Sequence, residues 1–168
     1  MIASLQSGLK ATFKDVEVSM PADGMMTVLV PRGSIPTVLR YLKEKGLDHL
    51  ALVSCVDWIE EGELELVYVL TCYMRSNTDY GSEQTVHVLL RTRVPRENPR
   101  LESVIGTFEN AEPYEREIHE LYGVHFDGHP RLIPLFLERE YETPPFRKDF
   151  DTRQYVEETF GSIPPVED

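Results

Sequence analysis

The first 46 residues show two kinds of hydrophobic pattern. Apolar residues recur every three or four positions over 2–13, which predicts a helix because that spacing places them on one face. The short apolar run 25–30 is followed by a proline and preceded by a glycine, as is typical of a strand. Helical spacing returns after Ser34, a good N-cap residue, and Gly46 ends this second predicted helix.

Three longer apolar segments follow, and each of them predicts a strand. They are Leu50–Trp58, Glu63–Met74 and Gln84–Arg91. The acidic stretch 60–63 contains a glycine and predicts a tight turn between the first two strands. The middle segment is apolar on both of its faces, which is typical of a central strand that is covered on both sides.

The two cysteines lie in the first two of these strands. Pairing the strands across the turn places Cys55 opposite Tyr68 and Cys72 opposite Ala51. This register keeps the two thiols apart, so we expect no disulfide and predict that both cysteines are buried in apolar surroundings. Four sulfur ligands are the usual minimum for an iron–sulfur cluster or a four-cysteine zinc site. The chain can form neither with its own cysteines.

A further helix is predicted to begin at Asn98 and Pro99, because proline is tolerated in a first helical turn. Its core side comprises four apolar residues: Leu101, Val104, Ile105 and Phe108. Helices and strands together predict an α+β fold, with a small, mostly antiparallel sheet and helices packed on it, followed by an extended C-terminal arm.

The segment Pro113–Tyr122 predicts a helix with two unlike faces, which Gly123 ends. Its apolar stripe comprises Tyr114, Ile118, Leu121 and Tyr122, with Glu115 and Glu117 at its flanks. Arg116 points away from this stripe, with His119 and Glu120 on the same outer side. We expect only solvent or a partner protein to contact the Arg116 side chain.

Three interpretations of this polar face are open. It is a solvated surface, a surface that contacts a partner, or part of a metal site. The metal site would combine His119, His125 and His129 with Glu115 or Glu120. The spacing disfavours it, because the helix lacks a second histidine at the position that a His-Glu-x-x-His motif requires.

Prolines change the character of the chain after residue 123. We predict a globular domain over 1–123 and a partner-docking arm over 124–168, because prolines at 130, 134, 144 and 145 favour an extended path. Seven large apolar side chains of this arm are expected to be poorly buried by the chain itself: Leu132, Leu135, Phe136, Leu137, Tyr141, Phe146 and Phe150. Exposed apolar groups on an extended segment indicate a surface on which that segment lies.

Composition excludes several classes of function. The 168 residues carry 17 basic and 29 acidic side chains, a formal net charge of −12, which repels phosphate backbones and disfavours nucleic-acid binding. No apolar run is long enough to span a bilayer, so we expect no direct membrane insertion. The N-terminus lacks the basic start and apolar run of a signal peptide, so we expect a cytoplasmic location.

Two motifs in the second half resemble one known family. The stretch Glu115–Pro130 reads Glu-Arg-Glu-Ile-His-Glu-Leu-Tyr-Gly-Val-His-Phe-Asp-Gly-His-Pro and resembles the signature of the 30 kDa subunit of respiratory complex I, which is the C subunit of NADH–quinone oxidoreductase. The stretch Pro145–Phe150 resembles a second element of the same family. Glu120, Pro134, Tyr141 and Phe146 depart from the usual family residues. The stretches Glu117–Gly123 and Pro134–Leu137 are more similar to relatives in energy-converting membrane-bound hydrogenases.

The resemblance implies a structural role without a cofactor on this chain. It implies no catalytic, cofactor-binding or metal-binding residue here. Partner subunits would carry iron–sulfur clusters and, in a hydrogenase-type complex, nickel–iron. The implied partners are the large hydrogenase-like (49 kDa-type) subunit and the small iron–sulfur subunit of the same complex. The implied location is the cytoplasmic side of the cell membrane. The alternatives are a stand-alone His/Glu metalloenzyme and a soluble acidic adaptor protein.

The polar face of the helix and the arm motifs together predict a subunit interface. Its residues are Glu115, Arg116, Glu117, His119, Glu120, His129, Pro130, Leu135, Phe136, Arg147, Lys148, Asp149 and Phe150.

Overall fold

The computed structural model describes residues 2–74, 84–138 and 141–161. Its central feature is a five-stranded sheet in the order β1-β2-β5-β4-β3. The strands are β1 (Glu17–Ala22), β2 (Met25–Leu29), β3 (His49–Trp58), β4 (Glu63–Met74) and β5 (Gln84–Pro95). Neighbouring strands are antiparallel except β2 and β5, which are parallel. The predicted α+β class with a mostly antiparallel sheet is confirmed.

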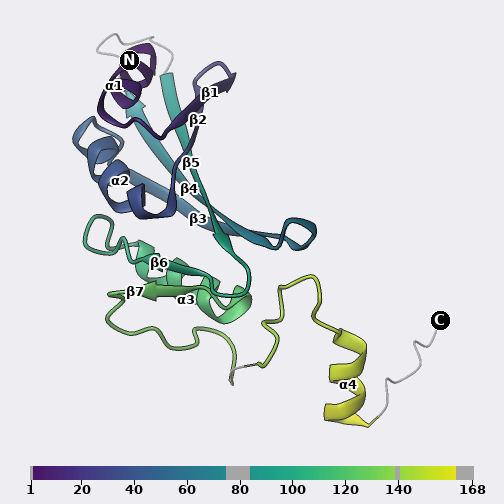
Figure 1. Ribbon diagram of the computed structural model, residues 1–168. Coiled ribbons are helices and arrows are strands. Elements are labelled where there is room, and N and C mark those ends of the chain that lie inside the picture. The colour runs from purple at the N-terminus through teal and green to yellow at the C-terminus, as the bar shows by residue number, and fades with distance from the viewer. Residues whose placement is uncertain (1, 75–83, 139–140, 162–168) are drawn as a thin grey trace, which may run out of the picture.

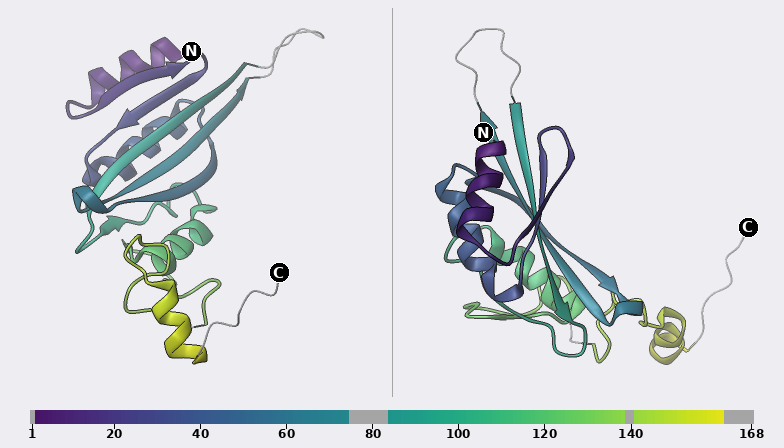
Figure 2. Two further views of the ribbon diagram at one scale, coloured as in Figure 1. Left: turned by 90° about the vertical axis from the view of Figure 1, so that its right-hand side faces the viewer. Right: turned by 45° about the horizontal axis from the view of Figure 1, so that its top comes forward.

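Two helices cover one face of this sheet (Figure 1). They are α1 (Ile2–Thr12) and α2 (Ile35–Glu44), and a short 3₁₀ turn, η1 (Arg32–Ser34), precedes α2. Ser34 occupies the predicted N-cap of α2, but its side chain makes no capping hydrogen bond. The views in Figure 2 show both helices on the same side of the strands, so the core lies between them and the sheet.

Strand β4 is central in the sheet, as its apolar pattern predicts, but only one of its two faces is fully covered. This strand lies between β3 and β5. Leu66, Tyr68 and Leu70 are completely buried, and they alternate with partly buried Val67 and Val69 on the other face. Successive side chains of a strand point to opposite faces of the sheet, so this alternation means that one face is better covered than the other.

The predicted register of β3 and β4 is wrong by two residues. Cys55 pairs with Leu66 rather than with Tyr68, and Cys72 pairs with Val86 of β5 rather than facing Ala51. The cause is the connection, because a 3₁₀ turn, η2 (Ile59–Glu61), with Gly62 at a φ of 69°, replaces the shorter turn that the sequence suggests. A bulge between Leu50 and Leu52 shifts the pairing again. Cys55 is buried, Cys72 is partly buried, and both are free thiols.

The helix predicted from Asn98 does not form. Residues Arg100–Glu102 form strand β6, which pairs in parallel with β7 (His125–Asp127), so that Leu101 lies beside Phe126. Turns follow from residue 103 to the start of α3 (Ala111–Tyr122). Pairing with a strand that is distant in the sequence outweighs the local helical spacing, because it buries Leu101 and satisfies backbone groups on both strands.

Strand β7 packs with the domain, and we therefore count the arm from residue 128 rather than from 124. Val124 and Phe126 are buried in the core. The expected extended path is not what the described residues 128–138 and 141–150 show, since they form turns and bends without a strand, and helix α4 (Thr152–Phe160), which the sequence patterns did not predict, follows. The Asp151 side chain accepts a hydrogen bond from the Gln154 N–H and caps this helix. Figure 1 shows α4 standing apart from the sheet. The part of the predicted arm at 162–168 lies outside the described residues.

Candidate functional site: helix α3 and the arm

Helix α3 attaches to the edge of the sheet through its predicted apolar stripe. Ile118 and Leu121 are buried against the domain. The Tyr114 hydroxyl donates to the Ala51 carbonyl at 3.0 Å, and the Asn110 side chain donates to the Leu50 carbonyl at 2.8 Å. Both carbonyls lie where the bulge interrupts β3, so α3 satisfies backbone groups at this edge of the sheet. This attachment directs the polar face of α3 away from the core.

The arm crosses the polar face of α3 and is held there by its own backbone. Arg116 donates to the carbonyls of Ile133 at 3.0 Å and Pro134 at 2.9 Å. The next residues of the arm donate their N–H groups to the Glu120 carboxylate, at 2.8 Å from Leu135 and 3.1 Å from Leu137. The Phe136 N–H lies between the two oxygens of this carboxylate, at 3.1 Å from each.

These contacts correct the expectation for Arg116. Its side chain is only 13% exposed and also contacts Glu112 at 3.3 Å. The expectation that only solvent or a partner contacts Arg116 is therefore wrong, because the arm of the same chain binds it. Charged groups that bond to backbone amides form stronger hydrogen bonds than neutral pairs do. Arg116 and Glu120 therefore position the arm.

A second attachment lies at the C-terminal end of α3, where helices leave carbonyl groups unpaired. The Phe146 N–H donates to the Leu121 carbonyl at 3.0 Å, and Arg147 Nε donates to the Tyr122 carbonyl at 2.7 Å. Gly123 ends the helix with a φ of 75°. A Cβ at Gly123 would lie 2.9 Å from Pro144 Cγ and 3.2 Å from Arg147 Nη2, so glycine also provides the space in which this part of the arm packs.

A third attachment links the arm to the end of the sheet. Arg96 binds Asp57 through two hydrogen bonds of 2.8 and 3.1 Å, and it also pairs with Asp149 of the arm. The Lys148 N–H donates to Asp57 Oδ2 at 2.8 Å. Burial alone would raise the pKa of Asp57, but the Arg96 guanidinium and the Lys148 N–H together hold that pKa below its ordinary value. Asp57 is therefore a buried anion that holds two segments together.

The apolar side chains of the arm are divided between burial and exposure. Leu132 packs on the core, and Tyr141 and Phe150 pack with Tyr155 of α4, with ring centroids 5.3–6.0 Å apart. Phe136 is 69% exposed and Phe146 is 58% exposed. The prediction of poor burial thus holds for the two phenylalanines and not for Leu132 or for the aromatic group at the start of α4.

The remaining predicted interface residues lie in different surroundings. Glu115 is completely buried, and its carboxylate accepts hydrogen bonds from Ser103 Oγ and the Val104 N–H, each at 2.7 Å. Burial raises the pKa of Glu115 to about 7. Glu115 therefore lies in the buried framework under α3 and not on its exposed face. Glu117 is partly exposed, and Pro130 is exposed.

The three histidines do not come together as a metal site. His119 lies in the last turn of α3, where its Nδ1 bonds to the Val124 carbonyl at 2.8 Å. His129 lies near the first turn, with Nε2 at 3.4 Å from the Glu112 carbonyl. His125 is beside His119, with ring centroids 6.3 Å apart. Within residues 2–74, 84–138 and 141–161, no group of three or more histidine, cysteine or acidic side chains is arranged to hold a metal ion.

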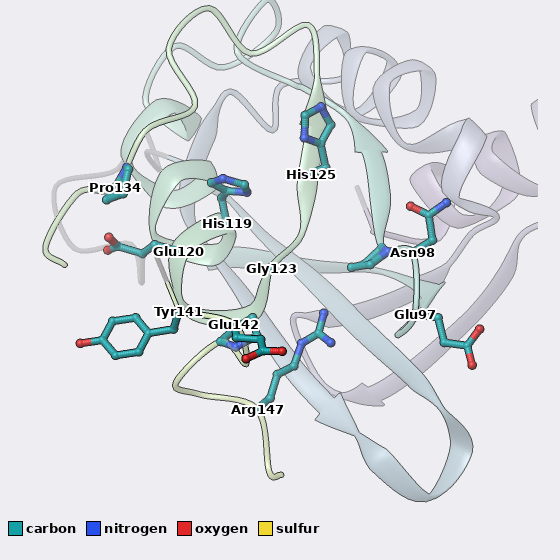
Figure 3. A pocket seen from close by; sticks show the side chains of 12 residues that line it. Glu97, Asn98, His119, Glu120, Gly123, His125, Pro134, Tyr141, Glu142 and Arg147 are labelled. Carbon is teal, nitrogen blue, oxygen red and sulfur yellow. The ribbon is translucent and has the colours of Figure 1, made fainter. Parts of the chain in front are cut away.

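A pocket of about 390 Å³ lies where these attachments meet (Figure 3). Its wall includes His119, His125 and Gly123, together with Pro144 and Arg147 of the arm. Because the arm forms one side, this pocket exists only when the arm is docked on α3.

The predicted interface did not include Asp57 and Arg96, the pair that holds the end of the arm. Neither residue lies in the two motifs, and their role depends on the end of the sheet meeting a segment much further along the chain. One signal was available for Asp57. In β3 it falls on the same face as Val53 and Cys55, so it is a carboxylate at a position that the alternation assigns to the core.

A family model supports the interpretation of the two motifs. Residues 28–156 match the family described as "Respiratory-chain NADH dehydrogenase, 30 Kd subunit". The chain belongs to this family. The match covers the sheet from β2 onward, helix α3 and most of the arm, and so includes all three attachments described above. The resemblance inferred from the motifs is confirmed.

Members of the 30 Kd subunit family from distant organisms are similar to this chain. It is 39% identical over 124 residues to the C subunit of F(420)H(2) dehydrogenase of Methanosarcina mazei, covering 73% of each chain. It is 37% identical over 114 residues to the C/D subunit of NADH-quinone oxidoreductase of Phocaeicola vulgatus, covering 68% of this chain and 20% of that relative. It is also 33% identical to the J subunit of the chloroplastic NAD(P)H-quinone oxidoreductase of Lemna minor, covering 67% of this chain and 68% of that relative. These relatives are subunits of oxidoreductases.

Two solved structures share the fold. A chain of the membrane-bound sulfane sulfur reductase, an archaeal respiratory membrane complex, superimposes with a TM-score of 0.81 at 27% identity, covering 99% of this chain and 95% of the other. A trypsin-resistant fragment of Nqo5 gives 0.62 at 25% identity, covering 78% and 98%. The higher coverage of the reductase chain means that the likeness extends to the arm. Among the described residues, no helix combines the length and the apolar character that crossing a bilayer requires.

Proposed function

We propose that this chain is a cofactor-free structural subunit in the peripheral redox arm of a complex I-like, membrane-associated oxidoreductase. In this proposal it docks on the large hydrogenase-like (49 kDa-type) subunit, next to the small iron–sulfur subunit, on the cytoplasmic side of the membrane. Its role is to support electron transfer coupled to ion translocation by holding the partner subunits in place. The docking role is the same for an NADH–quinone complex and for a hydrogenase-type complex.

One observation carries this proposal. The arm is fixed through its backbone, by Arg116 and Glu120 of α3, while Phe136 and Phe146 remain exposed. Large apolar side chains on a preorganised segment favour protein binding, because little ordering entropy is lost when a partner covers them. The relative named as a C/D subunit, of which this chain matches 20%, supports a D-type partner beside the arm.

The test is to replace Phe136 and Phe146 together by alanine and to measure the affinity of the chain for the large subunit. Burying one such side chain contributes roughly 1.5–3 kcal/mol when it was fully exposed. Since both rings are already partly covered, we expect a loss of about 2–4 kcal/mol for the pair, with the melting temperature of the isolated chain unchanged within about 2 °C. Met20→Ala, which removes an exposed apolar side chain from β1, is the matched control.

Unchanged affinity in the double variant would contradict the docking role.

A separate expectation concerns cofactors: the chain purified alone under anaerobic conditions should contain no iron, flavin or nicotinamide. Elemental analysis and a visible spectrum check it, and a cluster absorption band from the isolated chain would contradict it.

A further inference from the structure

Arg147 is a half-buried cation without an anionic partner in the described part of the chain. Its Nε donates to the Tyr122 carbonyl at 2.7 Å, which leaves both terminal nitrogens of the guanidinium available. The nearest acids, Asp57 and Asp149, are both bound by Arg96. A partly buried guanidinium is costly unless a carboxylate or several acceptors compensate for the water it has lost.

The surroundings of Arg147 add to this imbalance. Burial lowers the pKa of its guanidinium, and the nearby positive charge of Arg96 lowers it further. Asp149 and Asp57 act in the opposite direction, but burial and Arg96 outweigh them and the pKa stays below its ordinary value. The planar guanidinium of an arginine frequently binds a carboxylate through two parallel hydrogen bonds.

The guanidinium points into the pocket between α3 and the arm (Figure 3). Gly123 lies directly beside it, and the absence of a side chain there leaves Arg147 accessible from the pocket. His119 lines the same space. Because the Val124 carbonyl can only accept, His119 Nδ1 carries a proton, so Nε2 is the nitrogen left to bond a ligand.

The acids of the pocket do not supply the missing partner. Glu120 is occupied by the three N–H groups of the arm. Figure 3 shows Glu97 directed away from the pocket, and the exposed Glu142, although drawn on the same side as Arg147 and, like it, within the described range 141–161, forms no ion pair with it. The site is therefore a recess that presents an arginine and a histidine and is open to a group from outside the chain.

We propose that this pocket receives the carboxylate of an aspartate or glutamate side chain of the docked large subunit. Arg147 binds that carboxylate in bidentate fashion. This inference rests on the docking role proposed above and adds to it a specific recognition chemistry. The pocket needs the arm on α3, because the arm supplies Arg147 and Gly123, directly after α3, leaves the space beside it.

Zero-length cross-linking in the assembled complex tests this proposal. Arg147→Lys places a primary amine in the pocket, and a carbodiimide condenses that amine with a carboxylate only when the two are in contact. We expect one new cross-link, absent from the parent complex, between position 147 and a single acidic residue of the large subunit, mapped by mass spectrometry. Arg131→Lys, which places an amine on an exposed part of the arm, is the control for general proximity.

A charge reversal provides the second measurement. Arg147→Glu should lower the affinity of the chain for the large subunit at least tenfold, and an arginine at the cross-linked partner position should restore it. A cross-link only to Glu97 or Glu142 of the same chain, or none in an intact complex, would overturn the pocket assignment. That result is distinct from a failure of the docking role, which the Phe136 and Phe146 variant tests separately. Retention of a small carboxylate such as succinate, with no cross-link to the partner, would identify a metabolite site instead and also overturn the proposal.

Discussion

The sheet domain and the arm are stabilised in opposite ways. In the domain, apolar side chains are buried between the sheet and helices α1 and α2, and the charged groups lie mostly outside. In the arm, charged side chains of α3 and β3 hold the backbone, while Phe136 and Phe146 are left exposed. The arm is held mainly through its backbone, and although Leu132 and Tyr141 pack within the chain, Phe136 and Phe146 stay mostly exposed for another surface. The contrast therefore distinguishes the part that folds the chain from the part that we propose joins it to a partner.

The largest effect should come from the centre of the sheet. Leu66→Ala removes a completely buried side chain of β4 and should lower the free energy of unfolding by about 2–5 kcal/mol. Leu52→Ala on the open face of β3 should cost about 1 kcal/mol or less, because Leu52 is already 40% exposed. Urea denaturation measures both. Equal losses would show that the open face is as tightly packed as the core.

The pH dependence of stability tests the buried framework beneath α3. Burial raises the pKa of Glu115 from an ordinary value of 4.5 to about 7, so between these values the folded chain retains a proton that the unfolded chain releases. The stability that protonated Glu115 provides is complete below pH 4.5 and is lost as the pH rises toward 7. We expect a decline of about 2–3 kcal/mol between about pH 5 and 8.

Glu115→Gln removes this titration and should flatten the profile, which urea denaturation at a series of pH values will show. Glu117→Gln, on the same helix but partly exposed, is the control and should leave the decline in place. An equally steep profile in the Glu115 variant would mean that another group causes the decline.

A smaller and local effect is expected in the arm. Glu120→Gln replaces a carboxylate that accepts three backbone N–H groups by an amide with one acceptor oxygen. Hydrogen exchange at residues 135–137 of the isolated chain should accelerate about tenfold or more, which corresponds to about 1.4 kcal/mol, while the sheet amides keep their rates. Acceleration in the sheet as well would show that the arm and the domain unfold together.

The smallest effect should come from an exposed ion pair. Arg100 of β6 and Asp127 of β7 pair at the surface, with both side chains about half exposed. Arg100→Ala should change the free energy of unfolding by about 0.5 kcal/mol or less, because water solvates both charges when they are separated. If the free energy of unfolding fell by as much as we expect for Glu120→Gln, this exposed pair would contribute as much to stability as the charges that bind the arm.

Local patterns predicted much of the domain correctly. Helices α1, α2 and α3 and strands β2 to β5 lie close to their expected positions, because each buries one face or stripe that the sequence displays. Strand β6 was mistaken for a helix, because Leu101, Val104, Ile105 and Phe108 fit a helical period and the pairing with β7 is not local. Helix α4 was missed since prolines dominate the preceding stretch and its cap, Asp151, was not recognised.

Residue patterns were enough to predict the fold class, the family and the location of the informative segments, because periodicity and contiguous motifs are properties of neighbouring residues. The contacts of those residues could not be predicted in this way, because they depend on how distant segments fold together. Arg116 and Glu120 point away from the core, as the helical spacing requires, yet whether water, a partner or the arm receives them depends on the path of residues far along the chain. The same holds for Arg147, whose neighbours Gly123, His119 and Arg96 are brought together by folding, so its unpaired charge becomes visible only once those elements are in place.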